Sequence, residues 1–158
     1  MTRVTELDIR WTRYGSRVAT DLTTAALADL SVRYGGEGDT TPVLPGEFDP
    51  PAGGFLVAYL SDAPAGCVGW RTYAADSAIA ELKRLYVLPA YRGLGVAKAL
   101  LTAVEGAARS AGREHIWLET GTAQPEAIAL YERSGYSRIP DFGHYKDHDD
   151  VRSFGRRL

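Results

Sequence analysis

Hydrophobic and polar positions along this chain follow two different periods. Short segments in which apolar residues alternate with polar ones, or run together, are typical of strands. Three longer segments have apolar residues at helical spacing and lie between the strands. The expected strands span 7–13, 55–60, 66–73, 78–87, 115–120, 136–139 and 151–158, and the expected helices span 21–34, 95–110 and 126–134. This order of elements predicts an α/β fold.

The connections between these elements carry turn and capping residues. Residues 61–65 form a turn, so the strands on either side of it are expected to pair as a hairpin. The helix 95–110 is long enough to carry the chain across to a parallel strand at 115–120. Asp21 is expected to cap the first helix, and Pro125 occupies a first helical position.

Residues 35–54 are rich in glycine and proline and separate the first helix from the second strand. A connection of that length is unusual unless it has a function or contains a short helix of its own. One of these two explanations is therefore expected for the segment.

The expected strand at 78–87 changes face partway along. Ala80 and Leu82 share one parity, whereas Leu85 and Val87 share the other, and polar residues lie at the changeover. A β-bulge produces such a one-residue shift of face. The alternative is that both faces of the strand are buried, in which case parity carries no information.

A glycine-rich segment, Arg92–Lys98, follows this strand and begins the next helix. Gly93 and Gly95 permit backbone dihedrals and a close ligand approach that other residues do not. The start of a helix offers free N–H groups and the positive end of the helix dipole, and Arg92 and Lys98 add positive charge. The segment is expected either to bind a phosphate or pyrophosphate or to be a tight turn. It matches neither the P-loop pattern nor the dinucleotide pattern.

Length, composition and charge narrow the class of protein. The 158 residues, of which 45% are hydrophobic, suit one globular domain over 1–158. The net charge of −2 argues against a nucleic-acid partner. Cys67 is the only cysteine, so a reducing, cytoplasmic location is expected. We find neither a signal-peptide pattern nor a long apolar run, and expect no association with a membrane.

Two motifs resemble those of the GNAT superfamily, the acyl-CoA-dependent N-acetyltransferases. The first is Arg92–Ala97, which is similar to the family pattern Gln/Arg-x-x-Gly-x-Gly/Ala. The second lies within 118–136 and is similar to Asn-x-x-Ala-x-x-Leu-Tyr-x-x-x-Gly-Phe/Tyr, with Gln124 in place of the usual Asn. The resemblance covers roughly residues 55–140. It implies the GNAT fold, a mixed, mostly antiparallel sheet with helices on both faces.

The resemblance also implies acetyl-CoA as the cosubstrate. In the family the loop binds the pyrophosphate, and the pantetheine arm lies in a gap between the preceding strand and its neighbour. By resemblance, residues 35–54 shape the acceptor pocket; the alternative is a mobile surface loop. Family members often form homodimers, which makes a homodimer one expectation here. The residues expected to bind acetyl-CoA are Leu85, Val87, Arg92, Gly93, Gly95, Val96, Ala97, Lys98 and Gln124.

Transfer of an acetyl group from a thioester to an amine needs a base, stabilisation of the carbonyl oxygen and a proton for the thiolate. An alkyl ammonium, with a pKa near ~10, has no free lone pair until it loses a proton. The resemblance places Glu81 as the general base and Tyr131 as the general acid. The alternative for Glu81 is a structural carboxylate paired with Lys83 or Arg133, and the alternative for Tyr131 is a core aromatic residue.

The acceptor is expected to be a small-molecule amine or an amine of a peptide or protein. The acidic segment 141–150 would attract a cationic amine, or else is a solvated loop. His144 and His148 lie in this segment, but no metal site is expected. The presence of both Glu81 and Tyr131 favours catalysis. The alternative function is a non-catalytic acyl-CoA-binding or regulatory module on the same fold.

Overall fold

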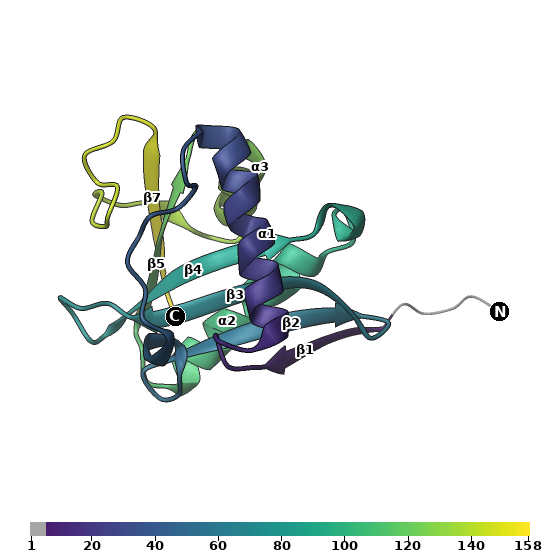
Figure 1. Ribbon diagram of the computed structural model, residues 1–158. Helices are drawn as coiled ribbons and strands as arrows, with labels where there is room; N and C mark the ends of the chain where they lie inside the picture. The colour runs from purple at the N-terminus through teal and green to yellow at the C-terminus, as the bar shows by residue number, and fades with distance from the viewer. Residues whose placement is uncertain (1–5) are drawn as a thin grey trace.

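One sheet and three helices account for most of residues 6–158, the part of the chain that the computed structural model describes (Figure 1). The strands are β1 (Leu7–Trp11), β2 (Gly53–Leu60), β3 (Ala63–Thr72), β4 (Ile79–Val87), β5 (His115–Gly121), β6 (Ser137–Arg138) and β7 (Val151–Arg157). The α-helices are α1 (Arg17–Tyr34), α2 (Val96–Ser110) and α3 (Pro125–Arg133), and short 3₁₀ helices span Pro45–Phe48 and Pro89–Tyr91. Within residues 6–158 no helix is both long and apolar enough to cross a membrane.

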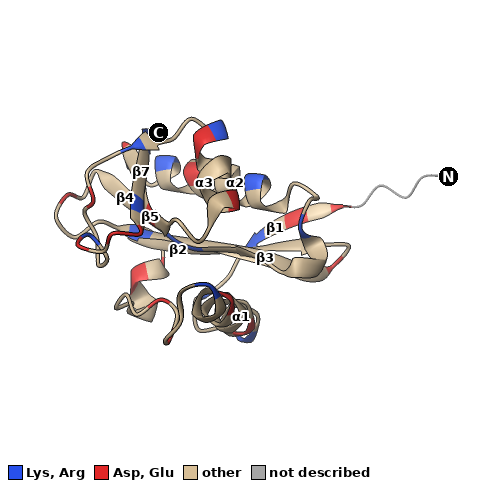
Figure 2. Cartoon of the chain, turned by 90° about the horizontal axis from the view of Figure 1, so that it is seen from above, with Lys and Arg blue, Asp and Glu red and all other residues tan. Residues whose placement is uncertain are grey.

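The strands of residues 6–158 form a single seven-stranded sheet in the order β1-β2-β3-β4-β5-β7-β6. Neighbouring strands are antiparallel except for β4 and β5, which are parallel because α2 carries the chain across between them. Figure 2 shows α1 on one face of the sheet and α2 and α3 on the other. The mixed, mostly antiparallel sheet with helices on both faces is therefore confirmed.

Each face of the sheet buries its own apolar cluster. On the side of α2, Leu100 and Leu118 are fully buried. On the side of α1, Phe48 and Phe55 pack edge to face, with ring centroids 6.1 Å apart. Phe48 comes from the 3₁₀ helix that precedes β2, so the segment rich in glycine and proline does contain a short helix.

β4 changes face at Arg84, as the parity of its apolar residues predicted. Arg84 has a φ of 62°, and the pairing of β3 with β4 shifts between Cys67 and Gly69. Leu82 before the shift and Leu85 after it therefore pack against the same core cluster. The β-bulge expected from the sequence is confirmed.

β4 and β5 pair only over their first residues. Ile79–Glu81 lie beside His115–Trp117, and beyond these residues the two strands separate. The sheet thus opens a gap between two neighbouring strands, close to the glycine-rich segment that follows β4. This gap positions the candidate site.

α1 begins a turn earlier than the sequence indicated. Ser16 is its N-cap, and the Ser16 side-chain oxygen accepts a hydrogen bond from the Ala19 amide at 3.3 Å. Asp21 lies inside the helix and pairs with Arg17 at 3.3 Å on its surface. The prediction that Asp21 caps the helix was wrong. The buried side of α1 begins at Ala19, and a small residue such as alanine gives only a weak hydrophobic signal for the start of a helix.

Candidate active site

A cavity of about 910 Å³ lies along the glycine-rich segment and the start of α2. Gly93 and Gly95 have φ values of 77° and 81°, which glycine adopts without strain, and Gly95 is the N-cap of α2. The Ala99 amide donates to the Gly95 carbonyl, so the helical amides before Ala99 have no carbonyl partner within the helix. These amides and the positive end of the dipole form a site suited to an anion.

All the residues predicted to bind acetyl-CoA line this one cavity. The Arg92 Nε donates to the Val87 carbonyl at 3.0 Å, which holds the guanidinium beside the loop. Gln124 is the N-cap of α3, and its side-chain amide donates to the Tyr34 hydroxyl at 3.2 Å. The predicted residues found in the lining are Leu85, Val87, Arg92, Gly93, Gly95, Val96, Ala97, Lys98 and Gln124.

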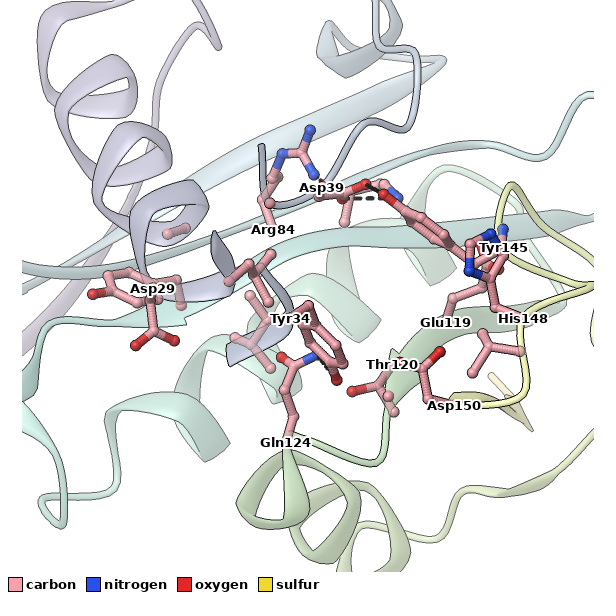
Figure 3. A pocket seen from close by; sticks show the side chains of 18 of the residues that line it. Asp29, Tyr34, Asp39, Arg84, Glu119, Thr120, Gln124, Tyr145, His148 and Asp150 are labelled. Atoms are coloured by element: carbon pink, nitrogen blue, oxygen red, sulfur yellow. Dashed lines mark hydrogen bonds and ion pairs between the residues drawn. The ribbon is translucent and has the colours of Figure 1, made fainter. Parts of the chain in front are cut away.

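A smaller cavity of about 330 Å³ occupies the gap where β4 and β5 separate. Its wall comes from the end of α1, the segment after α1, β4, β5 and the loop before β7. Figure 3 shows Glu119, Tyr145 and His148 together on one side of this pocket, with Asp29 on the other. The two cavities meet, because both are lined by Asp29, Leu85, Tyr86, Gln124 and Tyr131.

Tyr131 reaches this junction from α3. The residue is 5% exposed, and its ring centroid lies 5.6 Å from that of Tyr136. Burial raises the pKa of the Tyr131 phenol well above its usual value, so the hydroxyl keeps its proton at neutral pH. Tyr131 is therefore available as a hydrogen-bond donor where the cavities meet.

Two buried cations on β4 share one carboxylate in the wall of the smaller cavity. Asp39 pairs with Arg84, lies 3.6 Å from the Lys83 Nζ, and accepts hydrogen bonds from Thr41 and the Tyr145 hydroxyl. Burial acts to raise the pKa of Asp39, but Lys83 and Arg84 together hold that pKa well below its usual range. Asp39 thus stays ionised and joins the segment after α1 to β4 and to the loop before β7.

Glu119, on β5, is a second carboxylate of the smaller cavity. Its Oε2 accepts a hydrogen bond from the Tyr145 amide at 3.0 Å, whereas its buried Oε1 has no hydrogen-bond partner within residues 6–158. Burial raises the pKa of Glu119, and the Tyr145 amide and Lys83 oppose that shift without cancelling it. The sequence indicated Glu119 only as part of a strand. The alternation along the expected strand 115–120 places Glu119 on the same face as Trp117, and that was the one signal in the sequence. That this face borders a cavity follows only from the pairing of β5 with β4, which ends at Trp117.

Glu81 lies outside both cavities as residues 6–158 define them. The residue is 6% exposed, and its Oε1 accepts a hydrogen bond from the Arg71 Nε at 2.8 Å. Arg71 also donates to Glu47 and to the Pro42 carbonyl, so the segment after α1 covers the pair. The structure brings Tyr131 to the junction of the cavities and holds Glu81 away from it, beside Arg71.

The acidic segment 141–150 contributes to the wall of the smaller cavity. Tyr145, His148 and Asp150 line it, and His144 contacts the segment after α1. Within residues 6–158 no three His, Cys, Asp or Glu side chains gather closely enough to hold a metal ion.

Comparison with known proteins gives a family match. Residues 21–136 match the model of the Acetyltransferase (GNAT) family. The IAA acetyltransferase of Azospirillum brasilense is 38% identical to this chain over 91 residues. That match covers 58% of this chain and 59% of the relative, so the chain spans less than two thirds of the relative's length.

Solved structures share the fold. A Klebsiella pneumoniae protein described as an acyl-CoA N-acyltransferase superposes with a TM-score of 0.78 at 25% identity, over 96% of this chain and 97% of that one. A Bacillus anthracis protein described as a streptothricin acetyltransferase was solved in complex with acetyl coenzyme A. It superposes with a TM-score of 0.62 at 23% identity, over 74% of this chain and 69% of that one, and this likeness concerns the fold alone.

Proposed function

Because the chain belongs to the GNAT acetyltransferase family, we propose that it transfers an acetyl group from acetyl-CoA to a primary amine. One observation carries this proposal: two cavities of different chemistry meet at Tyr131. The larger cavity offers backbone amides and positive charge to an anion, and the smaller one offers carboxylates to an amine. A reaction between a bound thioester and a bound amine needs such a junction.

The larger cavity fits the phosphate and pantetheine parts of acetyl-CoA. The amides at the start of α2, with Arg92 and Lys98, would hold the pyrophosphate. Gly93 and Gly95 border open space, since a Cβ built on either would meet nothing within 4 Å. Leu85 lies past the residues that pair β4 with β5, so its backbone is available to the pantetheine amides. The Bacillus anthracis protein supports the capacity of this fold to hold acetyl-CoA.

The acetyl group is proposed to pass directly to the amine in a ternary complex. Cys67 is buried and its thiol donates to the Arg84 carbonyl, and burial raises the pKa of that thiol to about 12. Such a thiol is a poor nucleophile at neutral pH, which supports a route without an acetylated cysteine. Tyr131 is the proposed donor of a hydrogen bond, and then of a proton, to the departing sulfur.

Replacement of Arg92 by alanine is expected to weaken acetyl-CoA binding about tenfold, because a hydrogen bond to a charged group contributes roughly 1.5–3 kcal/mol before solvent exposure reduces it. Calorimetric titration measures the affinity. Arg109→Ala is the matched control, since Arg109 is an exposed arginine in the last turn of α2, at the end far from the glycine-rich segment, and is expected to leave the affinity unchanged. Equal affinity in wild type and Arg92→Ala would contradict the phosphate site.

The reaction itself is tested by thiol release from acetyl-CoA in the presence of pooled small amines and peptides. Release that depends on the amine is the expected result. Binding of acetyl-CoA without thiol release across the panel would favour a non-catalytic acyl-CoA-binding module instead. A chain that binds no acetyl-CoA would overturn the proposed function.

A further inference from the structure

We propose that Glu119 takes the proton from the acceptor amine, a role that the family resemblance assigned to Glu81. The proposal rests on the proposed function, because it concerns the acceptor side of the same pair of cavities. Two observations carry it: the place of Glu119 in the smaller cavity, and the buried oxygen of its carboxylate that has no hydrogen-bond partner within residues 6–158.

Glu119 lies where β4 and β5 part. Trp117 is the last β5 residue paired with β4, opposite Glu81, and Glu119 follows it on the same face of β5. The side chain lines the smaller cavity, which meets the larger one at Tyr131. An amine in the smaller cavity would thus have Glu119 in the wall around it and Tyr131 at the exit toward the thioester.

The two glutamates differ in what their oxygens contact. The Glu119 Oε2 accepts the Tyr145 amide, but Oε1 has no hydrogen-bond partner within the part of the chain that the structure describes. The Glu81 Oε1 is occupied by Arg71, and that pair is covered by the segment after α1. What separates the two residues is their place within residues 6–158: Glu119 lines the smaller cavity with an unpaired, buried oxygen, whereas Glu81 lies outside both cavities and is bound to Arg71.

The charges around Glu119 suit a base. Burial raises its pKa and nearby Glu81 adds to the rise, whereas the Tyr145 amide, Lys83 and the His144 amide oppose it. A carboxylate with a raised pKa holds an abstracted proton more firmly, while remaining ionised above that pKa. The other titratable groups that line the cavity come from every element around it: Asp29, Tyr34, Asp39, Arg84, Tyr86, Tyr131, Tyr145, His148 and Asp150.

Glu119, Tyr131 and solvent together account for every proton that moves in the transfer. Glu119 takes one proton from the alkyl ammonium and later releases it to solvent. The neutral nitrogen then bonds to the thioester carbonyl carbon, and the carbon–sulfur bond breaks. Tyr131 gives its proton to the departing sulfur and regains one from the newly bonded nitrogen. An amide and a free thiol are left, with no oxidant or reductant involved.

Glu119→Gln is the first test, with ethylamine as the acceptor. The variant is expected to lower kcat about 100-fold, the lower end of the usual contribution of acid–base catalysis. Its affinity for acetyl-CoA, measured by calorimetry, is expected to match that of wild type. Glutamine can still accept the Tyr145 amide, so the thermal unfolding midpoint is expected to change little.

The basicity of the acceptor separates a base from a structural residue. 2,2-Difluoroethylamine has nearly the shape of ethylamine but a lower amine pKa, so more of it is neutral in solution. The kcat deficit of Glu119→Gln is expected to shrink with this acceptor. With ethylamine the deficit is expected to shrink as the pH rises toward the amine pKa of about 10. A deficit equal for both amines and constant with pH would overturn the role of Glu119.

Two further glutamates serve as comparisons. Glu132 is exposed on α3, and Glu132→Gln is expected to leave turnover unchanged. Glu81→Gln removes the ion pair with Arg71 and is expected to lower the unfolding midpoint without a deficit that depends on amine basicity. If that dependence appears in Glu81→Gln instead of Glu119→Gln, Glu81 is the base and the proposal is wrong. A wild-type chain that releases no thiol with either amine would overturn the transfer itself, and the role of Glu119 with it.

Discussion

An Asp39→Asn variant is expected to lose about 3 kcal/mol of its free energy of unfolding at pH 7, because removal of one partner from a buried ion pair costs roughly 3–5 kcal/mol. Asp39 pairs with Lys83 and Arg84, whose side chains are only 8% and 5% exposed. Asparagine can keep the hydrogen bond from the Thr41 amide, so the substitution chiefly removes charge. Two buried cations would then lie side by side without the carboxylate that they share.

The stabilisation from Asp39 depends on pH in a defined direction. The pKa of Asp39 is lower in the folded chain than in the unfolded one, because Lys83 and Arg84 outweigh the effect of burial. Its contribution is therefore present above the unfolded pKa, roughly 3.9, and is lost as the pH falls toward the folded value. The difference in stability between wild type and Asp39→Asn is expected to be full at pH 7 and smaller at pH 3. Urea unfolding at the two pH values measures it.

Asp62→Asn is the matched control for this prediction. Asp62 is 92% exposed and pairs with Arg10 at 3.2 Å on the surface, where solvent screens the interaction. The control is expected to change stability little at either pH. A loss in Asp39→Asn no larger than that of Asp62→Asn would show that the buried cations do not need the shared carboxylate.

The same carboxylate links stability to the shape of the acceptor cavity. Tyr145 donates its hydroxyl proton to Asp39 and its amide proton to Glu119. One residue of the loop before β7 thus connects the ion cluster on β4 with the carboxylate proposed as the base. Loss of charge at Asp39 would weaken the hydrogen bond from the Tyr145 hydroxyl and so loosen that wall of the cavity.

Local patterns in the sequence were enough for much of the fold and for the cofactor side of the site. The bulge followed from a change of parity between Leu82 and Leu85, because side chains alternate along a strand. The anion site followed from Gly93 and Gly95, because a strand, a glycine loop and a helix start are consecutive in the chain. All but one of the predicted residues, those from Leu85 to Lys98, are near one another in sequence, and only Gln124 reaches this cavity from a distant segment.

The acceptor side depends on contacts between distant segments, which local patterns do not contain. Arg71 binds Glu81 from the neighbouring strand, and the sequence offered Lys83 or Arg133 as its partner instead. Glu119 meets Tyr145 through a long irregular loop whose path no periodicity indicates. The resemblance to a family could suggest that an acidic residue acts as base, but not which carboxylate of this chain lines the acceptor cavity.

Tyr131→Phe is expected to lower kcat about 100-fold while leaving the affinity for acetyl-CoA unchanged. The substitution removes only the hydroxyl of a side chain that is 5% exposed, so the packing against Tyr136 and Phe154 is kept. The phenol is proposed to act on the sulfur only as the carbon–sulfur bond breaks, and an interaction made in the transition state lowers kcat rather than binding. Thiol-release kinetics and calorimetric titration measure the two effects.

Tyr136→Phe is the matched control for Tyr131→Phe, because both changes remove the hydroxyl of a buried tyrosine. The Tyr136 hydroxyl donates to the Glu105 carboxylate at 2.7 Å, so its loss is expected to lower stability and to leave kcat unchanged. Wild-type turnover in Tyr131→Phe would exclude that hydroxyl as the acid. The deficit of Tyr131→Phe is also expected to be the same for ethylamine and 2,2-difluoroethylamine, because the phenol assists the leaving sulfur and not the attacking nitrogen. A deficit that depends on amine basicity belongs to the base alone, so the two acceptors distinguish the proposed roles of Tyr131 and Glu119 within one experiment.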